Sequence, residues 1–162
     1  MSLPKAKCRR FFLLAPLALA ACGFQPVYGR GGNGQLLQNR VMVDAPNARN
    51  GYFLTREIEQ QLGRGATPAY GLAVNVSLRE ERLAINRAGE TTRYDLIGTV
   101  DFALRDLQTG QIVTSGKVDN FTGYSATGTT VATQASKQDA EKRLMVILAE
   151  QIITRLYAAD LS

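Results

Sequence analysis

Apolar residues recur with helical spacing in two parts of the chain. The first stripe predicts a helix from about Tyr52 to Leu62, with Asn50 as its N-cap and Gly63 at its end. The second stripe predicts a long helix over residues 135–158, with a face that packs against the core. Its apolar positions are Ala140, Leu144, Ile147, Leu148, Ile152 and Leu156.

Between these two stripes, apolar and polar residues alternate with the period of two that is typical of β-strands. The alternation predicts three consecutive strands, over residues 72–78, 94–105 and 111–124. Beyond Arg82 the apolar positions change parity, so we expect a bulge or a change of exposed face there. An earlier strand is expected within residues 36–43, which contain the sequence VMV. Turns are expected at residues 87–90 and 106–110.

This order of elements, β-α-β-β-β-α, predicts the α+β class. We expect a two-layer sandwich in which a four-stranded mixed sheet is covered by two helices on one face. The other face of the sheet is expected to be polar and to meet water or a partner. Its residues would be Asn75, Ser77, Asp95, Thr99 and Asp101.

The segment 121–136 carries no charged residue and is rich in Thr, Ala and Gly. It is interpreted either as a plain connecting loop or as a surface that packs against a partner. On the second interpretation Ser125, Thr129 and Thr133 are candidate partner contacts.

The first 21 residues have the pattern of a secretory signal peptide. Lys5, Lys7, Arg9 and Arg10 give a positive start, and an apolar stretch and small residues follow. The apolar stretch is shorter than the roughly 20 residues that a membrane-spanning helix needs. The alternative is a short N-terminal anchor helix that is not cleaved.

The residues around Cys22 explain where such a signal would end. Leu19-Ala20-Ala21-Cys22 resembles a bacterial lipobox. In that class of signals the cysteine receives a diacylglycerol, the chain is cut before it, and the new amine is acylated, commonly with palmitate. Three acyl chains would hold the protein at a membrane almost permanently. The alternative is an ordinary cleavage site with a chance cysteine nearby.

The residue after the cysteine suggests which membrane carries the anchor. Gly23 stands where an aspartate would resemble an inner-membrane retention signal. We therefore expect a lipid anchor in the outer membrane, on its periplasmic side.

The composition of the mature chain bears on which partners and ligands it can bind. Four of the 19 Lys and Arg residues leave with residues 1–21, so 15 remain against 14 Asp and Glu. A net charge of +1 does not call for nucleic acid as a partner. The chain has no histidine, and its other cysteine, Cys8, leaves with the signal. We expect no metal site and no cofactor.

The chain therefore divides into three parts. Residues 1–21 are the lipoprotein signal peptide, residues 22–35 a lipidated flexible tether rich in glycine, and residues 36–162 a single α+β domain.

Three stretches of the mature chain resemble the LptE family of lipopolysaccharide-assembly lipoproteins, especially its alphaproteobacterial type. They are CGFQPVYG (22–29), ERLAINRAGETTRYDLIGTVDFALRDLQTGQIVTSGKV (81–118) and DAEKRLMVILAEQIITRL (139–156). The resemblance covers essentially the whole mature chain.

The resemblance implies an outer-membrane lipoprotein of the lipopolysaccharide export complex. It would bind lipopolysaccharide, plug the LptD-type β-barrel in a one-to-one complex and help to assemble that barrel. The alternative is an auxiliary lipoprotein of another envelope lipid-transport system. The family has no catalytic residues to carry over, and Cys22 is the position that its motif matches.

Arginines near the 87–90 turn are candidates for contact with lipid A phosphates, because a guanidinium presents two donors to a phosphate. These are Arg82, Arg87 and Arg93, with Arg79 further along the strand. Alternatively, they pair with Glu80, Glu81 and Glu90 on a solvated surface.

An enzyme is the least favoured class. A pair of carboxylates could act as acid and base, and Glu80 and Glu81 are adjacent. Neighbouring residues of a strand point to opposite faces, so they would not share a site.

Overall fold

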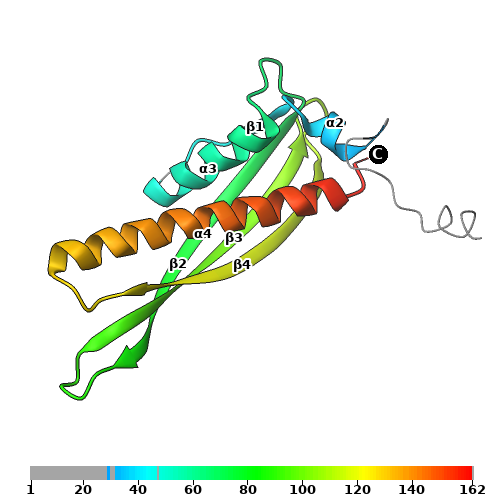
Figure 1. The fold of residues 1–162 in the computed structure, drawn as a ribbon. Helices are drawn as coiled ribbons and strands as arrows, with labels where there is room; N and C mark the ends of the chain where they lie inside the picture. Colours follow the sequence, from blue (N-terminus) through cyan, green and yellow to red (C-terminus); the bar gives the residue numbers. More distant parts are fainter. Residues whose placement is uncertain (1–28, 30–31, 47, 162) are drawn as a thin grey trace, which may run out of the picture.

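The computed structural model describes residues 29, 32–46 and 48–161 and shows an α+β domain (Figure 1). Its elements are α2 (Asn33–Leu37), β1 (Val41–Val43), α3 (Arg49–Leu62), β2 (Tyr70–Ile85), β3 (Thr91–Asp106), β4 (Ile112–Ser125) and α4 (Thr130–Ala158). The sheet order is β1-β2-β3-β4, with β1 parallel to β2 and the other neighbours antiparallel. The predicted fold class and the four-stranded mixed sheet are confirmed.

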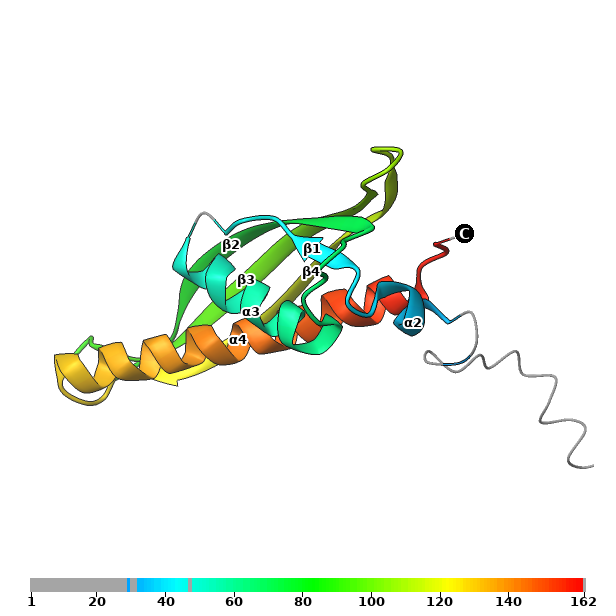
Figure 2. The ribbon, with the colours of Figure 1, turned by 90° about the horizontal axis from the view of Figure 1, so that it is seen from above.

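Both long helices lie on one side of the sheet, which gives the two predicted layers (Figure 2). The core between the layers contains apolar side chains of β3 and of α4, among them Val100, Leu104 and Leu148. Gly98 lies on the same face of β3, and a Cβ atom there would be 2.9 Å from side-chain atoms of both Leu144 and Leu148. The missing side chain therefore lets α4 pack closely on the middle of the sheet.

The hairpin of β2 and β3 extends beyond this core (Figure 1). Residues 79–90 are all exposed, and β4 pairs with β3 only as far as Ser125 opposite Arg93. The pairing of β2 with β3 shifts register on both sides of Ala84, which confirms the irregularity expected beyond Arg82. Gly89 adopts φ +83° in the turn, a conformation that glycine reaches without strain.

Helix α3 begins earlier than predicted. Its N-cap position is Ala48, and the cap has no side-chain hydrogen bond, so Asn50 lies inside the first turn. The prediction of Asn50 as the cap is wrong. The extended backbone at Ala48 marks the start of the helix, and the buried residues Gly51 and Leu54 hold its first turns against the core. Gly63 ends the helix with φ +78°, as expected.

The region before α3 differs more from its prediction. Within residues 36–43 only Val41–Val43 form a strand, and Asn33–Leu37 form one helical turn. The Asn33 side-chain amide donates to the carbonyl oxygen of Tyr157 (2.9 Å) and to that of Ala159, and Leu37 is fully buried. The last residues of the expected tether thus pack on the end of α4. Its residues 22–28, 30 and 31 lie outside the described residues.

The uncharged segment 121–136 is not a loop. Its first five residues continue β4, and residues 130–136 form the first turns of α4. The helix begins early because Thr129 is its N-cap, where the hydroxyl oxygen accepts the Ala132 N–H. The connecting-loop interpretation is therefore wrong, and the long helix starts five residues before the predicted Ala135.

Candidate functional site

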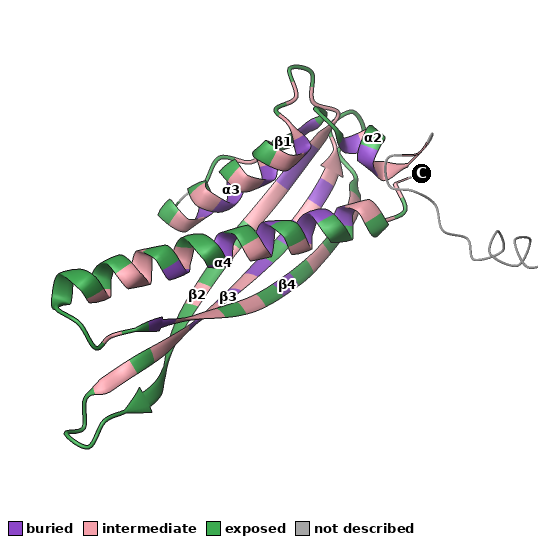
Figure 3. Ribbon diagram, in the orientation of Figure 1, coloured by how far each residue is buried: buried purple, intermediate pink, exposed green. Residues whose placement is uncertain are grey.

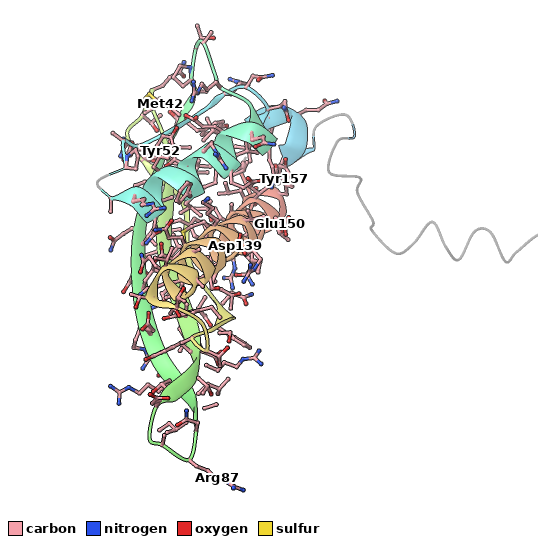
Figure 4. All side chains as sticks on the ribbon, turned by 60° about the vertical axis from the view of Figure 1, so that its left-hand side comes forward. Met42, Tyr52, Arg87, Asp139, Glu150 and Tyr157 are labelled. Carbon is pink, nitrogen blue, oxygen red and sulfur yellow. The ribbon has the colours of Figure 1, made fainter. Side chains whose placement is uncertain are left out.

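The candidate arginines gather at the free end of the β2–β3 hairpin, but they do not face one surface. Arg82 is paired across the strands with Tyr94, so it lies on the side of the helices. Arg93 directly precedes Tyr94 in β3, so its side chain lies on the opposite side of the sheet, because the side chains of a strand alternate between its two faces. Arg87 stands at the tip of the turn (Figure 4).

None of these three arginines forms an ion pair with a described residue, and the glutamates have other partners. Glu80 pairs with Lys137 (2.5 Å). Glu81 pairs with Arg79 (2.8 Å), and Glu90 accepts a hydrogen bond from the side-chain amide of Asn86 (2.9 Å). The pairing alternative therefore holds for Arg79, which pairs with Glu81, and not for Arg82, Arg87 and Arg93.

Two small polar recesses lie near the point where β4 turns into α4, and Arg93 lines the first of them. One recess, of about 300 Å³, is lined by Arg93, Gly123, Tyr124 and Ser125. The Ser125 hydroxyl is 3.0 Å from that of Thr127, which lines the second recess of about 360 Å³. In the first recess the Arg93 guanidinium and the Ser125 hydroxyl can bind an anionic oxygen, whereas the second recess is also lined by the Glu90 carboxylate.

On the side of the helices, the base of the hairpin is held by a polar cluster. The Tyr94 and Tyr124 rings stack with centroids 5.3 Å apart. Burial raises the pKa of the Tyr124 phenol above its ordinary range, and the Glu80 carboxylate raises it further. Lys137 joins Glu80 to α4. This ion pair connects the sheet to α4 at the base of the hairpin.

The three candidate partner contacts lie at the same end of the domain (Figure 1). Ser125 is the last residue of β4, Thr129 caps α4, and Thr133 lies in the first turn after it. Ser125 and Thr129 are exposed, and Thr133 is half-buried. The two exposed positions, Ser125 and Thr129, can be reached by a partner at this end.

The open face of the sheet is polar, as predicted, but it carries one exposed aromatic residue. Asn75 lies opposite Asp101, and Ser77 lies opposite Thr99. Phe121, 62% exposed, lies opposite Ile97 on this face. The sequence interpretation placed Phe121 in the third strand and at the start of the uncharged segment, but did not include it among the residues of the open face. Its odd position, opposite in parity to Val118 and Tyr124, could have placed it there.

Comparison with protein families identifies the family to which this domain belongs. The model of the LptE family, described as lipopolysaccharide-assembly, matches residues 39–156, which is most of the chain. The chain belongs to the LptE family. Among curated proteins, none matches it.

Solved structures with the same fold include lipoproteins of several bacteria. A candidate lipoprotein from Caulobacter crescentus CB15 is 28% identical, with a TM-score of 0.66 over 80% of this chain and 96% of that one. The rare lipoprotein B of Shewanella oneidensis is 16% identical, with a TM-score of 0.57 over 74% and 92%. A minor lipoprotein of Acinetobacter baumannii is 20% identical, with a TM-score of 0.52 over 74% and 89%. The last two show the shared fold alone.

Membership of the LptE family makes this chain an envelope lipoprotein of lipopolysaccharide assembly, in a family that is not enzymatic. Cys22, the expected lipid attachment site, lies outside the described residues. Within residues 32–46 and 48–161, no three His, Cys, Asp or Glu side chains gather as metal ligands. Across the same part of the chain, no helix is long and apolar enough to cross a membrane.

Proposed function

We propose that this protein is the outer-membrane lipoprotein subunit of a lipopolysaccharide export complex. It is anchored through acylated Cys22 on the periplasmic side, binds lipopolysaccharide, and plugs and helps to assemble an LptD-type β-barrel. The observation that carries the proposal is the LptE family match over residues 39–156.

The shape and charge of the domain support the role of a plug. The scaling for compact chains gives about 140 residues a radius of gyration near 14 Å, and the protruding hairpin makes this domain longer in one direction, which together suit a wide lumen (Figure 1). A small eight-stranded barrel is filled by its own side chains and would exclude it. The lumen of a large barrel is polar, and so is the open face with Asn75, Ser77, Thr99 and Asp101. The mature charge of +1, from 15 basic and 14 acidic residues, avoids strong repulsion from a mixed polar wall.

Contact with the lipopolysaccharide is proposed at the hairpin end. Arg87 and Arg93 form no ion pair with a described carboxylate, and the Ser125 hydroxyl lines the same recess as Arg93. Arg82 contributes from the other side of the hairpin. The phosphates of lipid A match guanidinium groups in charge and geometry.

Recovery of the complex is the central test. Extraction of the lipoprotein from membranes in mild detergent should recover one barrel per lipoprotein, identified by mass. Recovery of an ABC-type lipid transporter without the barrel would instead support an auxiliary lipoprotein of another envelope system.

The anchor is tested separately with Cys22→Ala. We expect this variant in the soluble periplasmic fraction or as an uncleaved precursor. A mature-sized variant that remains firmly in the outer membrane of cells lacking the barrel would contradict the anchor.

Lipopolysaccharide binding is tested with Arg87→Glu combined with Arg93→Glu. We expect weaker binding in a salt-sensitive way, with an unchanged unfolding midpoint. The matched control is Arg40→Glu with Arg155→Glu, two exposed arginines at the other end of the domain. Equal binding by both double variants would remove Arg87 and Arg93 from the site.

The barrel contact is tested with photo-crosslinkers at Ser125, Thr129 and Thr133. They should capture the barrel. A crosslinker at exposed Gln108, in the turn at the opposite end of the sheet, is the control. If the control captures the barrel and the three positions do not, this end is not the contact.

A further inference from the structure

A second cluster of positive charge lies on the helix layer, far from the hairpin tip. Arg49, Phe53 and Arg56 follow one stripe of α3, and Lys142 of α4 faces the same ring. The Arg49, Arg56 and Lys142 charges are 5.5, 5.8 and 5.8 Å from the centroid of Phe53. The ring of Tyr52 has its centroid 6.2 Å from that of Phe53. Tyr52 is 57% exposed and lies on α3 (Figure 4). We call these five residues the basic patch.

The three positive charges of the basic patch have no anionic partner among the described residues. Nearby carboxylates have other partners: Glu59 pairs with Arg64, and Asp139 pairs with Arg143. Glu57 accepts a hydrogen bond from Gln61. Three like charges around one ring repel each other, and the negative face of the ring offsets this only in part. The patch is therefore suited to an anionic surface.

We propose that the basic patch binds the anionic phospholipid headgroups of the leaflet that holds the lipid anchor. It would orient the helix layer toward the membrane while the lipoprotein is not yet inside its barrel. Arginines and lysine attract the headgroup phosphates, and Tyr52 and Phe53 suit the boundary between headgroups and acyl chains.

The position of the chain entry is compatible with this orientation. The described chain enters at α2, whose Asn33 is bonded to the last turn of α4, and α3 ends beside α2. The 14 residues of α3 span about 21 Å, so the patch lies about that far from the entry. The chain from Cys22 to Gly32 can extend about 33 Å, which is enough. The inference rests on the proposed anchor for placing the domain beside a leaflet.

Vesicle binding tests the patch without help from acyl chains. The probe is the mature chain with Cys22→Ser, mixed with vesicles of phosphatidylcholine alone or with one quarter phosphatidylglycerol. The patch variant is Arg49→Gln, Arg56→Gln and Lys142→Gln, which keeps both rings. The control variant is Arg40→Gln, Lys117→Gln and Arg155→Gln, with the same loss of charge at exposed positions outside the patch.

We expect binding only to the anionic vesicles at low salt. The patch variant should bind about 100-fold more weakly, since each cation near an anionic surface contributes roughly fivefold. The control variant should lose no more than a few-fold, and inorganic phosphate at millimolar concentration should not compete. Equal losses in the two variants, or equal binding to both vesicles, would overturn the inference.

Orientation provides a second measurement on the acylated protein. The mature chain has no thiol apart from Cys22, so one introduced cysteine can carry a dye. A dye at Gln60→Cys, on the stripe of the patch, should be shielded from an aqueous quencher on anionic vesicles, whereas one at Ser77→Cys on the open sheet face should not. Extraction of the patch variant in mild detergent measures separately whether it still binds the barrel. A variant that loses vesicle binding but still recovers the barrel leaves the proposed function intact.

Discussion

The two ends of the β2–β3 hairpin lie in different environments, although the same strands form both. At the body end, Leu72 and Leu104 are fully buried and lie opposite each other under the helices. At the free end, residues 79–90 are all exposed (Figure 3). Helix α4 shows the same division, because its buried residues begin only at Ala140. The core therefore stabilises one end and leaves the other available for binding.

The boundary between the buried end and the exposed end of the hairpin coincides with a change of residue type on the face of β2 that meets the helices. Leu72, Val74, Val76 and Leu78 follow one another on this face, and the next position is Glu80. The ion pair of Glu80 with Lys137 closes the core where the apolar residues stop.

The largest contrast is expected from one substitution made at both ends. Leu148→Ala removes a fully buried side chain and should lower the free energy of unfolding by about 2–5 kcal/mol. Leu83→Ala, at a position that is 57% exposed, should lower it by less than about 0.5 kcal/mol. Urea unfolding measures both, and similar losses would show that the hairpin end is part of the core.

The next prediction concerns the boundary between the two ends at alkaline pH. The folded protein raises the pKa of Tyr124, so above pH 10 the unfolded chain releases this proton while the folded one retains it. Stability should therefore fall as the pH rises, by up to about 1 kcal/mol near pH 11. Tyr124→Phe should reduce this fall.

The control for this measurement is Tyr52→Phe, at the 57% exposed tyrosine of α3. Unfolding midpoints at pH 8 and pH 11 separate the two variants. An alkaline loss that Tyr124→Phe leaves unchanged would mean that other groups dominate it.

A smaller effect is expected from the ion pair at the same boundary. Lys137→Met keeps the packing of the side-chain stem but leaves Glu80 without its partner. Both side chains are about one third exposed, so the loss should be at most about 1 kcal/mol. A double-mutant cycle with Glu80→Gln measures the coupling, and a coupling near zero would remove the pair from the boundary.

The body could be predicted from the sequence because its elements carry strong local signals. The alternation along β3 marks Leu96, Val100 and Leu104 as one face, and Gly63 and Gly89 adopt the positive φ that their turns require. The first turns of α4 carry no such signal. Residues 130–136 are exposed or half-buried and have no apolar stripe, so a helix there depends on its cap and on continuity with the buried part.

The hairpin end and the basic patch depend on tertiary structure. Spacing along the sequence groups Arg82 with Arg93, but the pairing of Arg82 with Tyr94 separates them to opposite sides. The basic patch brings Lys142 to Phe53 through the packing of α4 on α3, which no local pattern contains. The sequence therefore indicates which end carries the arginines, and the structure determines how they are arranged.

The smallest global effect is expected from Thr129→Ala, which removes the N-cap of α4. A lost cap costs about 1 kcal/mol of helix stability. Here the first ten residues of the helix contribute no buried side chain, so they can fray while the turns from Ala140 onward stay packed. Global unfolding in urea should shift by less than about 0.5 kcal/mol, whereas amide exchange at residues 130–136 should accelerate about fivefold. Thr129→Ser keeps the capping oxygen and should restore slow exchange. A full loss in global unfolding, with no local change in exchange, would show that the start of α4 unfolds only together with the body.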